Sequence, residues 1–285
     1  MVKFGRIYEL KVQGQELGEH LIKFPLTCKF SVERKNFAMS NTAQFSIYGL
    51  SLSSRKDIYY DSYFKKALVP ISFKAGYSSQ SNIPLIFSGN VKLAYTTREG
   101  PELVTHIDAL DGGFGVDTST IAQTIDPGWL FTPTIKRVMG KLAGVKVGQV
   151  LVGKEPEPGK SSVTFNGKVW DELQKYVPAN GSLFIDNGVV NMLGQNITLP
   201  APGIKELSSE TGLLNIPKKY GYQVDCQCLF EPNFVIGQFV KLVSTLAPWV
   251  NGDYKVIGLH HSGTISGVES GDARTDISLL STAAV

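Results

Sequence analysis

Pairs of histidine, aspartate and cysteine residues are the places in this sequence where a metal ion could bind or a proton could be transferred. His106 and Asp108 are two residues apart in an alternating stretch, so in a strand they would share one face. His260 and His261 are adjacent, so in a strand their rings would point to opposite faces and could not bind one ion together. Because a zinc site needs about three or four protein ligands, we expect a solvated sheet face at the first pair and structural or surface histidines at the second.

The three cysteines are expected to be reduced and buried, with no metal bound. Cys226 and Cys228 are separated by one residue, whereas zinc-binding pairs usually have about two to four between them, and Cys28 is distant in sequence. Alternate cysteines on one strand more often line a core. The first residues lead into an alternating strand and not a secretory signal, so we expect assembly in the cytoplasm, where thiols stay reduced.

Enzyme signatures give no assignment. The glycines at 112–115, flanked by Asp111 and Asp117, lack the endings of a phosphate-binding or calcium-binding loop, and no serine-hydrolase elbow or zinc-protease motif occurs. We therefore predict no catalytic, cofactor-binding or metal residue. A cell-wall glycan hydrolase using Asp108, Asp111 or Glu172 stays open as an alternative that a zymogram would test, although the sequence fixes no pair of carboxylates ~5–10 Å apart.

Composition excludes two further classes of protein. The 285 residues carry 28 basic and 25 acidic side chains, a net charge of +3, and the basic residues are scattered, which does not support a dedicated nucleic-acid-binding protein. No run of ~18 apolar residues occurs, so no membrane anchor is expected.

Strict alternation of apolar and polar residues predicts a mainly β (α+β) protein. In 26–34 the apolar residues Cys28, Phe30 and Val32 alternate with polar ones, which is typical of a strand with one buried face. The pattern returns at 44–48, 71–75, 85–97, 221–230, 238–243, 254–265 and 277–280. We expect sheet in the first and last thirds of the chain.

Helical spacing is confined to three segments, at 52–67, at 132–144 and around 169–178, and the tight turn at 186–188 predicts a hairpin. The change of character after residue 110 predicts a domain boundary. We expect a first β tube-like domain at 1–110, a mixed α/β middle domain at 111–205 and a second β tube-like domain at 206–285.

Four aromatic residues gather at the end of the first predicted helix: Tyr59, Tyr60, Tyr63 and Phe64. Four aromatics among six positions of a helix cannot all face inward. We interpret them as a candidate interface with a partner protein.

The chain resembles the tube-capping baseplate hub proteins of contractile-tailed bacteriophages. The stretches that carry the resemblance are 87–91 with 98–102, the strand end at 108–113, and the ordered motifs at 212–217, 230–238 and 251–263 of the C-terminal third. No lysozyme-like insertion is evident in the sequence, so cell-wall cleavage would belong to a partner.

This resemblance implies a homotrimer in which two small tube-type β-barrel domains per chain make a pseudo-sixfold ring. Such a hub joins the hexameric tail tube protein to the trimeric central spike protein and lets genomic DNA pass without specific binding. The tape measure protein and baseplate wedge proteins are further expected partners, and the expected location is the tail baseplate of the virion. A distal tail protein or an injection-system hub of a related machine is the alternative.

Overall fold

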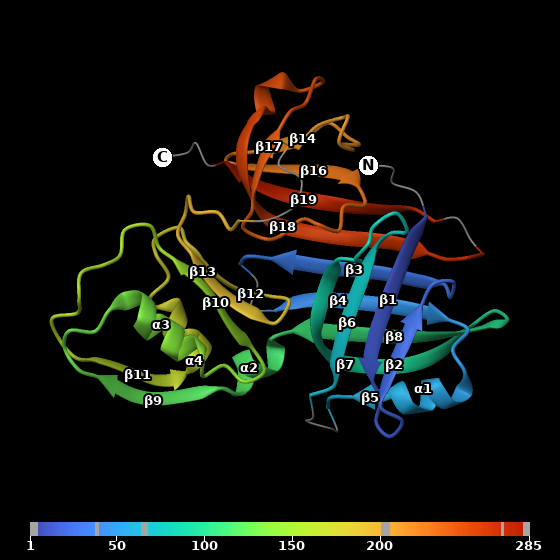
Figure 1. Ribbon diagram of the computed structural model, residues 1–285, viewed down its shortest axis with the longest axis horizontal. Coiled ribbons are helices and arrows are strands. Elements are labelled where there is room, and N and C mark those ends of the chain that lie inside the picture. Colours follow the sequence, from blue (N-terminus) through green and yellow to red (C-terminus); the bar gives the residue numbers. More distant parts are fainter. Residues whose placement is uncertain (1–4, 38–39, 64–67, 201–205, 269–270, 282–285) are drawn as a thin grey trace.

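The computed structural model describes residues 5–37, 40–63, 68–200, 206–268 and 271–281, and the fold is mainly β. Within these residues, one sheet of fourteen strands joins the first third of the chain to the last (Figure 1). Its strands follow the order β15-β16-β19-β18-β3-β4-β8-β7-β6-β1-β2, with β5, β14 and β17 off this path.

The first third contributes eight strands and one helix to the described structure. They are β1 (Arg6–Gln13), β2 (Glu19–Lys23), β3 (Cys28–Lys35), β4 (Asn41–Tyr48), α1 (Leu52–Ile58), β5 (Tyr60–Asp61), β6 (Pro70–Tyr77), β7 (Leu85–Glu99) and β8 (Glu102–Asp111). The long strand β7 pairs with β6 at its beginning and with β8 along the rest, so β1 and β6 cross over β3, β4 and β8 (Figure 1).

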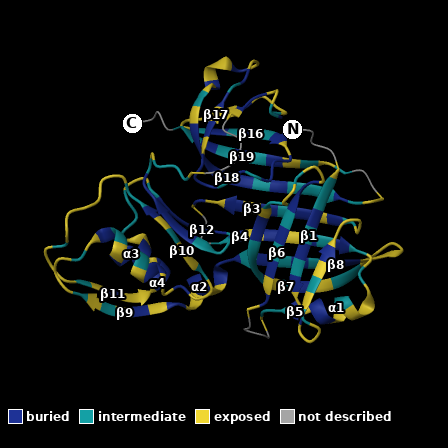
Figure 2. Cartoon of the chain, viewed as in Figure 1, coloured by how far each residue is buried: buried dark blue, intermediate teal, exposed yellow. Residues whose placement is uncertain are grey.

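An aromatic core fills the space between these crossing strands. The Phe73 ring lies 5.1 Å from the Phe30 ring and 4.8 Å from the Phe45 ring, centre to centre. Both distances suit tilted aromatic packing, which adds about 0.5–1.5 kcal/mol per pair beyond area burial. The alternation predicted for residues 26–34 is confirmed, because Cys28, Phe30 and Val32 are buried in this core. Figure 2 shows how buried and more exposed residues are distributed over the strands.

The last third contributes the other strands of the large sheet. They are β14 (Glu206–Leu207), β15 (Lys218–Tyr220), β16 (Gln223–Leu229), β17 (Phe239–Leu242), β18 (Gly252–Ile265) and β19 (Ala273–Ser281), with the short 3₁₀ helix η1 (Pro248–Val250). A separate apolar core, which includes Val240, Val256 and Leu279, lies under them.

Strands β3 and β18 join the two ends of the chain. They pair antiparallel from Lys35 opposite Gly258 to Cys28 opposite Ile265. Two separate tube-type barrels are therefore not confirmed, because the described strands of both ends belong to one continuous sheet with no closed barrel among them. The physical reason is that β3, from the first third of the chain, pairs with β18, from the last third. Neither strand therefore leaves a free sheet edge at this junction.

The middle of the chain packs beside the large sheet as a mixed α/β layer. Its elements are α2 (Gly113–Thr118), β9 (Thr120–Ile125), α3 (Phe131–Met139), β10 (Lys146–Leu151), β11 (Val163–Lys168), α4 (Val169–Gln174), β12 (Ser182–Asp186) and β13 (Val189–Leu193). Strands β12 and β13 form the predicted hairpin, with Asn187 and Gly188 at positive φ (53° and 74°) as a tight primed turn requires.

All three predicted helices extend further than the observed ones: α3, expected at 132–144, ends at Met139, and α4, expected around 169–178, ends at Gln174. The helix expected at 52–67 ends at Ile58, because Tyr60 turns into β5 and pairs with Ala94 of β7. Helix α3, expected to begin at residue 132, begins at Phe131, so Thr132 lies inside its first turn. The carboxylate of Glu155 accepts hydrogen bonds from the Thr132 N–H (2.8 Å) and hydroxyl (2.7 Å), so a loop distant in sequence supplies the cap.

Candidate functional site

An extended polar surface lies on the outward side of strands β16, β19, β18, β3, β4, β8 and the second half of β7. We call this side the polar face. Alternate residues of these strands point into the two cores, and the intervening ones carry polar groups. One polar member from the middle of each strand, in sheet order, is Asp225, Asp276, His260, Ser31, Gln44, His106 and Thr97.

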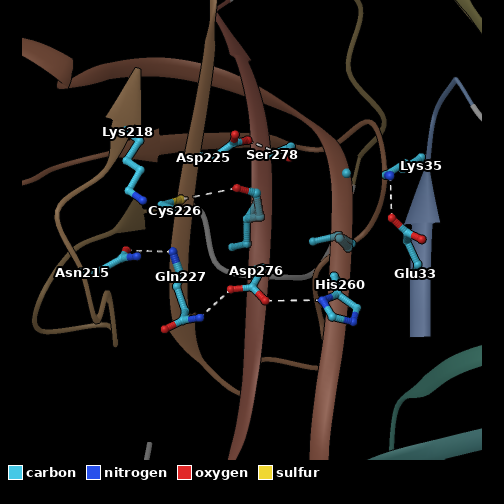
Figure 3. A pocket seen from close by; sticks show the side chains of 13 residues that line it. Glu33, Lys35, Asn215, Lys218, Asp225, Cys226, Gln227, His260, Asp276 and Ser278 are labelled. Carbon is cyan, nitrogen blue, oxygen red and sulfur yellow. Dashed lines mark hydrogen bonds and ion pairs between the residues drawn. The ribbon is translucent and has the colours of Figure 1, made fainter. Parts of the chain in front are cut away.

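A row of hydrogen bonds and one histidine–carboxylate contact crosses four strands of the polar face, from β16 to β3. Figure 3 shows the part of this row that runs from Gln227 through Asp276 to His260. The Gln227 side-chain N–H donates to Asp276 Oδ1 at 2.6 Å, and the other Asp276 oxygen lies 3.4 Å from His260 Nδ1. On the far side of the ring, His260 Nε2 lies 2.9 Å from Ser31 Oγ. The row therefore passes from the last third of the chain to the first across the β18–β3 junction.

A second row crosses β4, β8 and β7 around His106. Its Nδ1 lies 3.1 Å from Ser46 Oγ, its Nε2 lies 2.7 Å from Thr97 Oγ1, and the Tyr95 ring stacks on it at 5.1 Å. His106 and Asp108 are on the same half-buried face of β8, as the alternation predicts. Both imidazole nitrogens have protein partners, so His106 of β8 connects side chains of the neighbouring strands β4 and β7 and stabilises the sheet surface.

A shallow hollow of about 320 Å³ lies on the polar face over β16, β19, β18 and β3 (Figure 3). Charges of both signs line it, including Lys218, Asp225 and Asp276. At its border Lys35 forms an ion pair with Glu33 on the same strand. The surface thus carries mixed charge, with carboxylates and ammonium groups interspersed.

Ser31, His260 and Asp276 lie next to one another in the order of a serine hydrolase triad, and sequence reasoning missed this grouping. Acyl transfer also needs N–H groups aimed at the developing oxyanion. Strand β3 is paired along both edges at Ser31, with Ser262 of β18 opposite on one side and Gln44 of β4 on the other. Its backbone N–H groups belong to the sheet ladder, so the arrangement lacks that part of a hydrolase.

The carboxylates considered for glycan hydrolysis are not brought together. Asp108 lies on the polar face, whereas Asp111 is three positions further along β8 and points to the inner side. Glu172 lies on α4 in the middle layer, where Lys175 donates to it at 2.6 Å. These positions do not supply the paired carboxylates of a glycosidase.

His261 lies on the opposite side of β18 from His260 and is fully buried, as expected for adjacent strand residues. Its Nδ1 lies 2.9 Å from Thr275 Oγ1, and its ring packs edge-on against Phe230. Burial, with the nearby positive charge of Arg34, holds the pKa of His261 well below its usual value, so the ring is neutral.

The three thiols, of Cys28, Cys226 and Cys228, are free and buried in the cores. Burial raises the pKa of Cys28 and of Cys226, which keeps both thiols protonated. Among the described residues, no group of three or more histidine, cysteine, aspartate or glutamate side chains is placed to hold a metal ion. The helices of the described part are all too short or too polar to cross a membrane.

The four aromatics of the candidate interface are divided by the structure. Tyr59 and Tyr63 are 60% and 85% exposed, whereas Tyr60 is buried in the first core and is not available to a partner. Tyr60 is buried because it is part of β5 and not of a helix. Phe64 lies outside the described residues. An interface at Tyr59 and Tyr63 stays a prediction.

The fold is similar to those of tail proteins of known structure. A tail protein from Neisseria meningitidis MC58 matches with a TM-score of 0.64 and 11% identity over 97% of both chains. The 43 kDa tail protein of prophage MuSo2 from Shewanella oneidensis matches with a TM-score of 0.61 and 9% identity, over 96% of this chain and 97% of that one.

A third similar structure is the E. coli c3393 protein, described as a type VI secretion component with structural similarity to the T4 tail proteins gp27 and gp5. Its TM-score is 0.57 at 11% identity, over 95% of this chain and 76% of that one. No curated protein matches the sequence. The family model described as "Baseplate hub gp41" matches residues 9–264, most of the chain, and the protein therefore belongs to this family of bacteriophage baseplate hubs.

Proposed function

We propose that this protein is a structural hub that joins the tail tube to the central spike, with the polar face as the wall of the DNA channel. The observation that carries the proposal is the continuity of that face across the β18–β3 junction. A channel wall formed by both ends of each chain requires strands that pair across this junction. Two barrels connected only by a linker would leave a gap in the wall between them.

The chemistry of the polar face suits passage of DNA without binding. Strong DNA binding comes from clustered lysine and arginine side chains that neutralise phosphates. Here the two rows of hydrogen bonds engage His260 and His106 with neighbouring side chains, and acidic residues such as Asp276 stand among the basic ones. Mixed charge gives phosphates no continuous track of cations to bind.

The sheet order supports a match between threefold and sixfold partners. Four neighbouring strands come from the last third (β15, β16, β19, β18) and the next four from the first third (β3, β4, β8, β7). Three copies would thus present six four-strand units around one opening, and repeated contacts of one kind close such rings. Segments 1–110 and 206–285 would be the two tube-like units, with 111–205 as the mixed middle segment.

The proposed partners are two further copies of the chain, the tail tube protein and the central spike protein, with the tape measure and wedge proteins around them. Tyr59 and Tyr63 are the candidate contacts. In this role the protein has no catalytic activity or cofactor, and it assembles in the host cytoplasm before it becomes part of the virion tail. An injection-system hub is the second candidate, favoured by the fold shared with the c3393 protein.

Particle mass tests the proposal. The purified chain, measured alone and with its tube protein by mass photometry, is expected at three times 31.1 kDa and to bind the end of a hexameric tube. A ring of six copies would instead indicate a distal tail protein, and a stable monomer that binds neither tube nor spike would contradict a hub. Assembly on an injection-system tube in place of a phage tube would favour the second candidate.

A further inference from the structure

The large sheet holds the β12–β13 hairpin through three neighbouring strands. Arg34 of β3 donates from Nε and Nη2 to both carboxylate oxygens of Asp186, at 2.7 and 2.6 Å. Asn41 of β4 donates to the Ile185 carbonyl at 2.8 Å, and Asp111 of β8 accepts from the Gly188 N–H at 2.8 Å. We call these three side chains and the turn at 185–188 the hairpin clamp.

The hairpin clamp contains two carboxyl groups and one guanidinium. Arg34 and Asp111 are 2% and 1% exposed, and Asp186 is also buried. Both nitrogens on one side of the guanidinium are bound to Asp186, and its Nη1 reaches the Phe234 carbonyl at 3.4 Å. Asp111 therefore has no cation of its own, and its Oδ2 is buried without a hydrogen-bond partner in the described structure.

A second ionised carboxylate in this place would leave a net negative charge away from water. Such a charge is costly, and buried groups usually take up a proton instead. We propose that Asp111 is a buried proton-binding site: it is protonated while the hairpin is tightly held, and its ionisation loosens the hold of the large sheet on β12 and β13. The proton would sit on Oδ2, since Oδ1 accepts from Gly188.

The burial of Asp111 and the charges around it set the pH range in which its ionisation loosens the hairpin. Burial, and next the charge of Asp186, raise the pKa of Asp111 to about 7, although the N–H groups of Gly188 and Asn187 and the charge of Arg34 act in the opposite direction. His261, next to Arg34, is neutral and does not compete for the proton. The site therefore responds near neutral pH, and the inference does not depend on the hub role.

The direction of the response follows from proton linkage. Because the pKa of Asp111 is raised in the closed state, the closed hairpin is most stable below about pH 4 and loses stability as the pH rises toward 7. Above about pH 7 the carboxyl is ionised in both states, and the loss levels off. The equilibrium constant for opening of the hairpin is therefore expected to rise roughly 50-fold between pH 5 and pH 7.

Hydrogen exchange of the full-length protein, corrected for intrinsic rates, measures this opening for amides 182–193. The wild type is expected to lose protection from pH 5 to 7, and Asp111→Asn, which imitates the protonated acid, is expected to show no such change. The matched control is Asp108→Asn on the polar face of the same strand, which should keep the wild-type response. An unchanged response in Asp111→Asn would overturn the proposal.

If Asp111→Asn does not fold, infrared spectroscopy of the wild type provides a second test of the proposal. A buried protonated carboxyl gives a carbonyl band separate from those of solvated acids, and this band should disappear with a midpoint near pH 7. Absence of any such band at pH 5 to 6 would contradict a proton on Asp111.

Discussion

Removing the cation of the hairpin clamp should destabilise the protein far more than removing a surface cation. Arg34→Met leaves Asp186 buried without its bidentate partner and removes a positive charge that lowers the pKa of Asp111. Breaking a buried ion pair from one side costs about 3–5 kcal/mol. We therefore expect a loss of about 3–5 kcal/mol at pH 8, and a smaller loss at pH 5, where Asp111 is protonated and adds no second negative charge beside Asp186.

Urea unfolding followed by tryptophan fluorescence measures this loss. The control is Lys11→Met, which breaks the exposed ion pair with Glu19 (2.9 Å) and should leave the unfolding midpoint unchanged. The double variant Arg34→Met/Asp186→Leu should recover most of the stability, because no unpaired charge replaces the pair. The reasoning is refuted if Arg34→Met costs under about 1 kcal/mol, or if the double variant is as unstable as the single one.

Two further variants test other joints between the middle layer and the large sheet. In Gly112→Ala, at φ 73°, the new Cβ would lie 2.5 Å from the Ile185 side chain. Thermal unfolding should therefore show a loss of about 1–3 kcal/mol in the free energy of unfolding. The control is Gly100→Ala, where the new Cβ meets open space and the loss should be smaller. Burial lowers the pKa of Lys255, which donates to the Gly194 carbonyl, to about 8. Between about pH 8 and 10 the folded state therefore binds fewer protons at Lys255 than the unfolded state does, so the stability of the wild type relative to that of Lys255→Met should rise over this range; equal slopes for the two proteins would contradict this.

Local patterns in the sequence were sufficient for most strands, for the positions of α3 and α4 though not for their C-terminal ends, and for the β12–β13 turn. Their signals are alternation, helical spacing and an Asp-Asn-Gly turn, all set by neighbouring residues. Helix α1 was predicted too long, because its end depends on Tyr60 pairing with Ala94 of β7. Capping of α3 by Glu155 escaped prediction for the same reason, since the partner is distant in sequence.

The polar face and the hairpin clamp depend on contacts between the two ends of the chain. Ser31 and His260 are 229 residues apart, and no local pattern predicts that β3 and β18 pair. One signal for the clamp was present, however. Continuing the alternation of Cys28, Phe30 and Val32 places residue 34 on the buried face, and an arginine there requires a buried partner.

An electron-microscopic reconstruction of the ring bound to its tail tube tests the central claim most directly. Three copies should surround one opening, with the polar face, marked by Ser31, His260 and His106, turned toward it and continuous from copy to copy. A ring in which this face points outward, or is covered by a neighbouring protein, would contradict its role as the wall of the DNA channel.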